Sequence, residues 1–286
     1  MSRMRPRLGL LLICGLLVPS ELAAWGLDVH RFIVDRAIRD LPDRMRPFYD
    51  EHRSFIVEHS IDPDLWRQVG MPGEGPRHYL NLDAYGEFPF PRLPRDRDAA
   101  VCRFGADVVD RNGTLPWRVA ELFARLVDGF ERHARGGSAG ALDDVRLFSS
   151  VVSHYVSDAC VPFHAVVSYD GQATAQRGIH RRFETELFTR YRSRVSVAPQ
   201  ALLAVDDPRD FAFALLGSFE AVDAPLRADR DAARVDPRYG DRYFDRFFAD
   251  ARPVLEQRLA ASISRVASVL AAAWERAGRP GLPGGR

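Results

Sequence analysis

Apolar residues recur at helical spacing along almost the whole chain, and alternating strand patterns are scarce. Helices are expected at about 28–41, in a second run ending near 57, and at about 98–111, 115–135, 141–160, 179–193, 207–233 and 247–276. A Gly- and Pro-rich stretch at 70–94 predicts an ordered but irregular loop around a site. The pattern predicts one all-α, multi-helix domain over residues 25–276. Residues 277–286 are expected to form a flexible tail.

The first 24 residues differ from the rest of the chain. Three arginines precede an apolar run at 8–18, and small residues follow at 23–24. This order is typical of a cleaved secretory signal peptide. The apolar run is too short for a comfortable membrane span, and no other stretch approaches the required length, so no integral membrane span is expected. The mature chain would begin at Trp25 and be periplasmic or secreted.

The charge balance excludes one class of function. All 40 basic side chains are Arg, and they are set against 39 acidic ones, which leaves a formal net charge of +1. A chain this close to neutrality lacks the global basicity that non-specific nucleic-acid binding usually needs. A dedicated DNA-coating protein is therefore not expected.

The stretch HYVSDACVPFH, residues 154–164, carries the strongest chemical signal. His154 and Asp158 are four residues apart on one predicted helix, so both side chains project from the same face and can chelate a divalent metal. Pro162 prevents the helix from continuing normally, because it lacks an N–H and clashes with the preceding turn. His164 can therefore turn toward a second ion.

A second pair repeats this spacing within 31 residues of the first. His180 and Glu184 are four residues apart in GIHRRFETELF, on another predicted helix. Upstream candidates are the acidic pair Asp62 and Asp64, together with His78 and His30. By contrast, the remaining histidines fall among Arg and Glu on helices, where a solvated surface position is expected: His52, His59 and His133.

Taken in chain order, these residues resemble the zinc-dependent phospholipase C and S1/P1 nuclease family of secreted, all-α, trinuclear zinc phosphodiesterases. The resemblance runs from Trp25 through the helix HRFIVDRAI, an Asp before a His, HxxxDxxxPxH and HxxxE, over about residues 25–195. The spacing to His78 favours Asp64 over Asp62 as the matching aspartate.

The resemblance implies three zinc ions. One would be held by Asp64, His78, His154 and Asp158, a second by His164, His180 and Glu184, and a third by the amine and carbonyl of Trp25 with His30 and Asp158. Asp158 would bridge two ions. In the implied reaction a metal-bound hydroxide attacks the phosphodiester, and Asp64 orients or deprotonates this nucleophile. Asp64 and Asp158 are thus the expected catalytic residues.

The substrate is less sharply indicated. HxxxE resembles the phospholipase branch of the family, whereas the four-residue gap between Trp25 and His30 resembles the nucleases. Phospholipid headgroup esters are the preferred substrate, and a single-strand nuclease or nucleotidase is the alternative. A non-catalytic zinc-stabilised binding protein is a third possibility. Four aromatic residues could line a substrate pocket or merely pack the loop against the helices: Tyr79, Phe88, Phe90 and Phe163.

Two cysteines remain after the predicted cleavage, Cys102 and Cys160. An exported pair can form a disulfide, and the sequence leaves the bridged and free states open.

Overall fold

The computed structural model describes residues 25–137, 139–209 and 213–284, so the expected signal peptide at 1–24 lies outside the described residues. These residues contain helices and no strand, which confirms the all-α class. The α-helices are α1 (Leu27–Arg39), α2 (Arg46–Glu51), α3 (Arg53–Glu58), α4 (Asp62–Gln68), α5 (Arg97–Phe104), α6 (Ala106–Arg111), α7 (Leu115–Ala134), α8 (Ala139–Asp158), α9 (Ile179–Arg181), α10 (Leu187–Tyr191), α12 (Leu215–Glu220), α13 (Asp223–Val235) and α14 (Asp241–Arg276).

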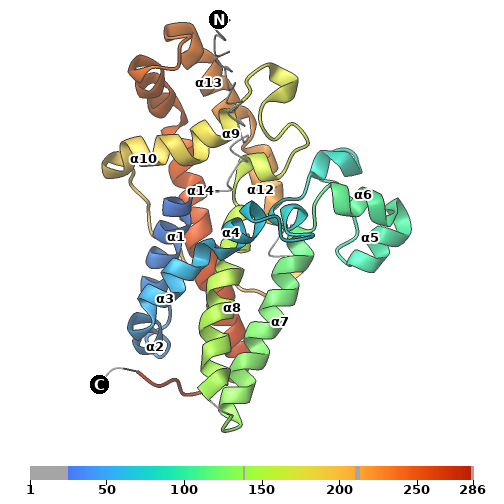
Figure 1. The fold of residues 1–286 in the computed structure, drawn as a ribbon, viewed down its shortest axis with the longest axis vertical. Helices are drawn as coiled ribbons and strands as arrows, with labels where there is room; N and C mark the ends of the chain where they lie inside the picture. The colour runs from blue at the N-terminus through green and yellow to red at the C-terminus, as the bar shows by residue number, and fades with distance from the viewer. Residues whose placement is uncertain (1–24, 138, 210–212, 285–286) are drawn as a thin grey trace, which may run out of the picture.

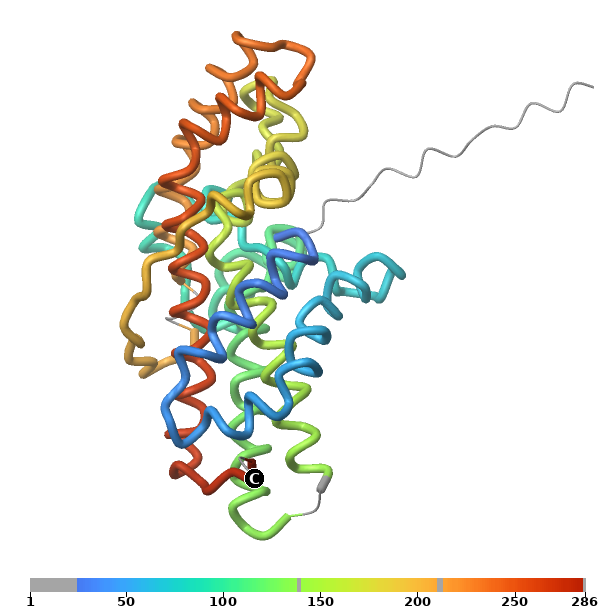
Figure 2. Tube along the Cα trace, turned by 90° about the vertical axis from the view of Figure 1, so that its left-hand side faces the viewer, coloured from blue at the N-terminus to red at the C-terminus, as the bar shows by residue number. Residues whose placement is uncertain are grey.

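The longest helix, α14, organises the molecule. Its 36 residues span about 54 Å at the usual rise per residue. It packs against α1, α7, α8 and α13, and α7 and α8 pair with each other. Figure 1 shows α13 beside the upper end of α14 and the α7–α8 hairpin at its lower end. Figure 2 shows α14 running along much of the long axis, and the shorter α1 packs against part of it.

Several helix boundaries differ from the expected ones for local reasons. The predicted helix at 98–111 is two helices, because Gly105 adopts φ +89° between α5 and α6. The predicted helix at 207–233 is likewise divided into α12 and α13, and α14 begins at Asp241 rather than near 247. Helix α8 ends at Asp158, the residue whose carbonyl the ring of Pro162 would meet if the helix continued.

The end of the described chain is packed rather than free. The ring Nε2 of His133 lies 2.9 Å from the carbonyl oxygen of Gly281, and the indole of Trp274 donates to the carbonyl of Pro280 at 2.8 Å. These contacts hold the expected flexible tail against α7 and α14. No described helix has the length and apolar character needed to span a membrane.

The two described cysteines are free thiols, so the disulfide left open by the sequence is not formed. Cys102 is exposed on α5, whereas Cys160 is buried just beyond α8, where its thiol lies 3.7 Å from the carbonyl oxygen of Val156.

Candidate metal centre

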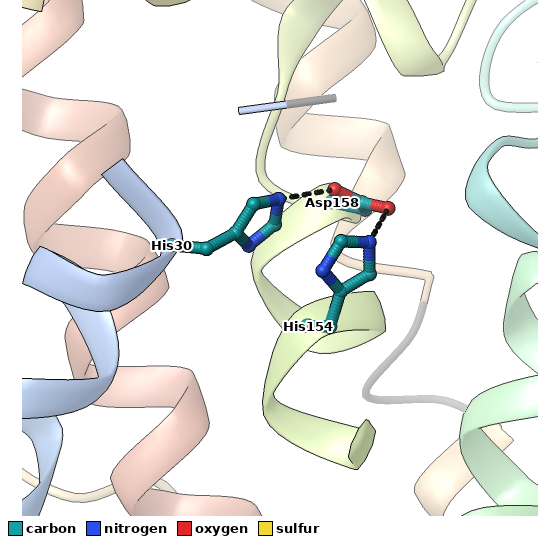
Figure 3. A group of neighbouring side chains, drawn as sticks. All are labelled: His30, His154 and Asp158. Carbon is teal, nitrogen blue, oxygen red and sulfur yellow. Dashed lines mark ion pairs between the residues drawn. The ribbon is translucent and has the colours of Figure 1, made fainter. Parts of the chain in front are cut away.

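The last turn of α8 forms the middle of the candidate site. His154 and Asp158 are fully buried, and the Nε2 of His154 lies 3.3 Å from an Asp158 oxygen. The other ring nitrogen of His154 lies 2.8 Å from the carbonyl oxygen of Ser60, which only an N–H can satisfy. The Nε2 of His154 instead faces Asp158 (Figure 3) and the Nδ1 of His78, which lies 3.1 Å away.

The N-terminal helix brings a second histidine to the same aspartate. The Nε2 of His30, on α1, lies 3.4 Å from the other Asp158 oxygen, and its ring stacks on His154 with centroids 3.9 Å apart. Figure 3 shows His30 directed at one oxygen of Asp158 and His154 directed at the other. Trp25 is fully buried, and its indole donates to the carbonyl of Ser157 at 3.0 Å. The beginning of α1 is therefore anchored at the end of α8.

A close approach explains why the residue after Trp25 is glycine. A Cβ on Gly26 would lie 2.7 Å from Cγ2 of Thr185, on a π-helical turn (η6, Arg182–Glu186) that also contains Glu184. Any larger residue would push the chain away from this turn. The start of α1 therefore touches the segment that bears the HxxxE pair.

Asp64 and His78 approach the centre from the other side. Asp64 lies in the first turn of α4, is 1% exposed, and has one oxygen 3.9 Å from the Nδ1 of His78. That nitrogen is 3.0 Å from Asp158 and 3.1 Å from His154. Asp62 instead pairs with His59 at 2.8 Å, away from the cluster. The structure thus places Asp64, not Asp62, beside His78.

His164, His180 and Glu184 form the remaining group. The Nδ1 of His164 lies 2.6 Å from the carbonyl oxygen of His78, which ties the 3-10 turn after α8 to the irregular loop. The Nε2 of His180 lies 3.0 Å from a Glu184 oxygen. Three groups of possible ligands therefore converge, His30 with His154 and Asp158, Asp64 with His78 and His154, and His164 with His180 and Glu184.

Burial sets the protonation of the imidazoles. Desolvation lowers the pKa of His164 to about 3 and that of His180 to about 4, so both rings are neutral near pH 7. Desolvation also places the pKa of His30 well below its ordinary value. Neutral imidazole is the form that binds metal ions. These rings are ready to coordinate without first losing a proton.

The carboxylates respond in two ways. Burial raises the pKa of Asp64 and that of Glu184, because neither has enough nearby positive charge to offset desolvation. Burial has the same tendency at Asp158, but the surrounding His154 and His164 hold the pKa of Asp158 well below its usual range. At His78 desolvation is outweighed by Asp158 and Glu74, which raise the pKa of the ring to about 9. Asp158 is therefore the stable anion at the middle of the centre.

The unpartnered atoms of the cluster fit a set of cations. Among the described residues, buried side-chain nitrogens and oxygens without a hydrogen-bond partner are concentrated here: Nε2 of His30, both oxygens of Asp64, Oδ1 of Asp158, both ring nitrogens of His180 and both oxygens of Glu184. Leaving so many buried polar atoms unpaired would cost several kcal/mol. Imidazole and carboxylate ligands in groups of three match the donor set that zinc prefers.

Two residues near the centre were not among those expected from the sequence. Glu74 is fully buried, with one oxygen 3.4 Å from the Nε2 of His78 and the other accepting from Arg77 at 2.8 Å. The hydroxyl of Tyr155 also donates to Glu74. Glu74 precedes His78 by four residues, the spacing of the other two pairs. Only its Gly- and Pro-rich surroundings concealed this signal.

The second such residue is Arg67, one turn after Asp64 on α4. Its positive charge acts on Asp64, His180 and Glu184, lowering the pKa of each, and it forms no ion pair with any described residue. The i, i+3 spacing from Asp64 places both side chains on one face of α4 and could have indicated it.

The four aromatic candidates have different environments. Phe163 is fully buried with its ring 5.6 Å from that of His180, so it supports the histidine rather than facing a substrate. Phe90 is 4% exposed and packs on Phe219. Phe88 is 48% exposed, and the partly buried Tyr79 lies 3.3 Å from the carbonyl of Arg111 through its hydroxyl. Phe88 and Tyr79 thus remain accessible.

Comparison with known protein families gives one match that covers most of the chain. The model of the family described as zinc dependent phospholipase C matches residues 29–248, which is more than half of the chain. No curated protein matches the chain.

Proposed function

Because the chain belongs to the zinc-dependent phospholipase C family, we propose that it is an exported hydrolase that cleaves phospholipid headgroup esters. Three zinc ions would be bound by Trp25, His30, Asp64, His78, His154, Asp158, His164, His180 and Glu184. The proposal includes removal of residues 1–24, so that Trp25 provides a free α-amine. The mature protein would act in the periplasm or outside the cell.

The convergence of buried, unpartnered ligand atoms is the observation that carries the proposal. Two of the three ligand groups share His154, and the third approaches them through His164, whose Nδ1 lies 4.0 Å from an Asp158 oxygen. Such an arrangement is costly without bound cations and favourable with them. The match to the family adds the identity of the metal and the class of reaction.

Different side chains of the site would have different roles in binding and cleaving a phosphodiester. Bound zinc would supply Lewis acidity and positive charge toward the phosphate. Asp64, with both oxygens unpartnered and a raised pKa, would orient an attacking water and accept its proton. Arg67 would bind a phosphate oxygen, because its guanidinium has no carboxylate partner within the described residues. Phe88 and Tyr79 would contact the group attached to the phosphate.

A side-by-side assay tests the proposal. The mature, zinc-loaded protein would be given phosphatidylcholine vesicles, a soluble chromogenic phosphocholine ester and single-stranded DNA. We expect a higher kcat/KM for the two choline esters between pH 5 and 8. Faster turnover of DNA across that range would favour a nuclease, and turnover of none of the three would favour a non-catalytic zinc protein.

One observation favours the nuclease alternative. Trp25 and His30 are separated by only four residues, and Trp25 lies directly on the end of α8. These four residues are a short stretch of chain between two proposed ligands, as in the nuclease branch that the sequence resembles. The same assay therefore includes the nucleic acid as a substrate in its own right.

A further inference from the structure

Arg182 is a buried cation placed between two of the proposed zinc ligands. It begins the π-helical turn, two residues after His180 and two before Glu184, and it is 9% exposed. A π-helical turn is rare and locally less favourable than an α-helical one, and such turns occur often at functional sites. This segment therefore needs support from outside itself.

The side chain of Arg182 leaves the metal centre and enters the α13–α14 hairpin. Its Nε and Nη2 donate to one oxygen of Asp229, on α13, at 3.1 and 2.8 Å. Its Nε also donates to the hydroxyl of Tyr243, on α14, at 3.0 Å, and that hydroxyl donates to Asp229. The other oxygen of Asp229 accepts from the amide of Gln176 at 2.6 Å. Both Asp229 oxygens are thus engaged inside the protein.

The backbone before the turn is held by the same guanidinium. Arg182 donates to the carbonyls of Arg177 at 2.8 Å and Gln176 at 3.3 Å. A Cβ on Gly178, which has φ +84°, would lie 2.7 Å from the Nη1 of Arg182. Asp170 accepts from the N–H of Gly178 at 2.8 Å and from that of His180 at 3.3 Å. Side chains therefore fix the chain just before His180.

A buried ion pair of this kind is a poor source of net stability, because desolvating the two charges offsets most of their attraction. The main effect of the pair is to fix the position of the π-helical turn. The pair connects α13, which otherwise packs along α14, to the short segment bearing His180 and Glu184. The side chains of those two ligands lie 3.0 Å from each other and have no hydrogen bond to any other described side chain.

We propose that Arg182 and Asp229 are positioning residues that set the zinc affinity of the site formed by His164, His180 and Glu184. The inference rests on the proposed metal centre. It assigns to the α13–α14 hairpin the task of holding the π-helical turn so that the imidazole and the carboxylate converge. Removing the pair should weaken zinc binding at this site and leave the other two sites nearly unchanged.

The decisive variant removes both charges together, because a single substitution would leave a buried charge unpaired and could prevent folding. Arg182→Met with Asp229→Leu keeps apolar volume in both places. A matched control is Arg190→Met with Asp241→Leu, an exposed pair at 3.2 Å that joins α10 to the start of the same helix, α14. Arg182→Lys, which retains the charge, should restore part of the affinity.

Zinc titration of the metal-free proteins against a chromophoric chelator provides the first readout. Wild type and control should bind three ions tightly, and the Arg182–Asp229 double variant should bind two tightly and one about 10- to 100-fold more weakly. Thermal unfolding in excess chelator provides the second readout. The metal-free double variant should have an unfolding temperature equal to or above that of metal-free wild type.

Two results would overturn the inference. The first is an unchanged zinc affinity at the third site together with a lower unfolding temperature of the metal-free double variant. This result would mean that the Arg182–Asp229 pair contributes only to stability. Fewer than three ions in wild type, with no loss of zinc in His180→Ala, would remove the third site itself. That second result is seen in the wild type, so it identifies a failure of the proposed metal centre rather than of the positioning role alone.

Discussion

The side chain of Asp158 lies beside four of the proposed histidine ligands. His30 and His164 are near one of its oxygens, and His78 and His154 are near the other. We expect Asp158→Ala to lose at least one zinc and to lower activity by more than about 100-fold, beyond the range typical of outer ligand contacts. Elemental analysis and kcat/KM measure both effects. Asp62→Ala is the control, and an equal effect in the two variants would contradict the central role of Asp158.

Glu74 provides a gentler test at the same scale. Its carboxylate lies against the side of His78 that faces away from Asp158, and contacts with His78, Tyr155 and Arg77 outweigh burial and lower the pKa of Glu74 to about 2. Glu74→Gln removes the charge while keeping the shape. We expect zinc affinity to fall roughly 10- to 100-fold, as for other outer-shell carboxylates.

The matched control for that measurement is Glu121→Gln, which alters an exposed carboxylate paired with Arg118. Equal zinc affinities in Glu74→Gln and wild type would remove Glu74 from the metal centre.

The low pKa of His180 predicts a pH effect on the metal-free protein. The folded pKa is about 4 and the unfolded value is near 6.5, so between these values only the unfolded chain binds the proton. Stability therefore falls as the pH falls through this window, by up to about 1.4 kcal/mol per pH unit. His180→Leu lacks this contribution. Urea unfolding of both metal-free proteins at pH 7, 6 and 5 should show that the free energy of unfolding falls more steeply with falling pH in wild type than in the variant. An equal fall in the two proteins would refute this.

At the scale of elements, the helical class and most long helices were predictable because their apolar faces repeat every 3.6 residues. The π-helical turn was not, since a single extra residue per turn leaves no periodic trace in five residues. The break at Gly105 was missed because a lone glycine is tolerated within many helices. The pairs on α8 and after Gly178 were visible because i, i+4 spacing has a geometric meaning within one helix.

The relations among these pairs were not visible in the sequence. Glu74 contacts His78 in a segment without helical periodicity, and Arg182 reaches Asp229 across 47 positions. Contacts of this length depend on how elements pack, which spacing along one element does not report. Assigning Phe163 to the core likewise required the packing of the turn after α8.

The entry to α1 carries a prediction about maturation. A backbone nitrogen can bind zinc as an amine only if it is a free terminus, because an amide nitrogen has no available lone pair. Trp25 is fully buried and its indole donates to the carbonyl of Ser157, which fixes the residue that would carry the free amine at the end of α8. A variant with one extra residue before Trp25 should bind one zinc fewer and lose most activity while remaining folded. Equal zinc content and turnover would favour a dinuclear enzyme.

At the scale of the whole molecule, the proposed ions join segments that are distant in sequence, from α1 to the π-helical turn. Their removal should therefore lower stability. At a zinc concentration a thousand times Kd, one site contributes about 4 kcal/mol, which for a domain of this size corresponds to roughly 10 °C in Tm. Calorimetry with and without chelator measures the difference. Zinc should restore the Tm and magnesium should not. An unchanged Tm after chelation would show that bound ions do not stabilise the fold.

The α-amine of Trp25, which the mature chain would place at the end of α8, can be followed by chemical labelling. All 40 basic side chains are Arg, so the α-amine is the only primary amine that the polypeptide possesses. An amine-reactive dye can consequently attach at one atom, which in the mature chain belongs to Trp25. The extent of dye attachment, followed by mass spectrometry while zinc is added, would read the state of that single nitrogen without any engineered label.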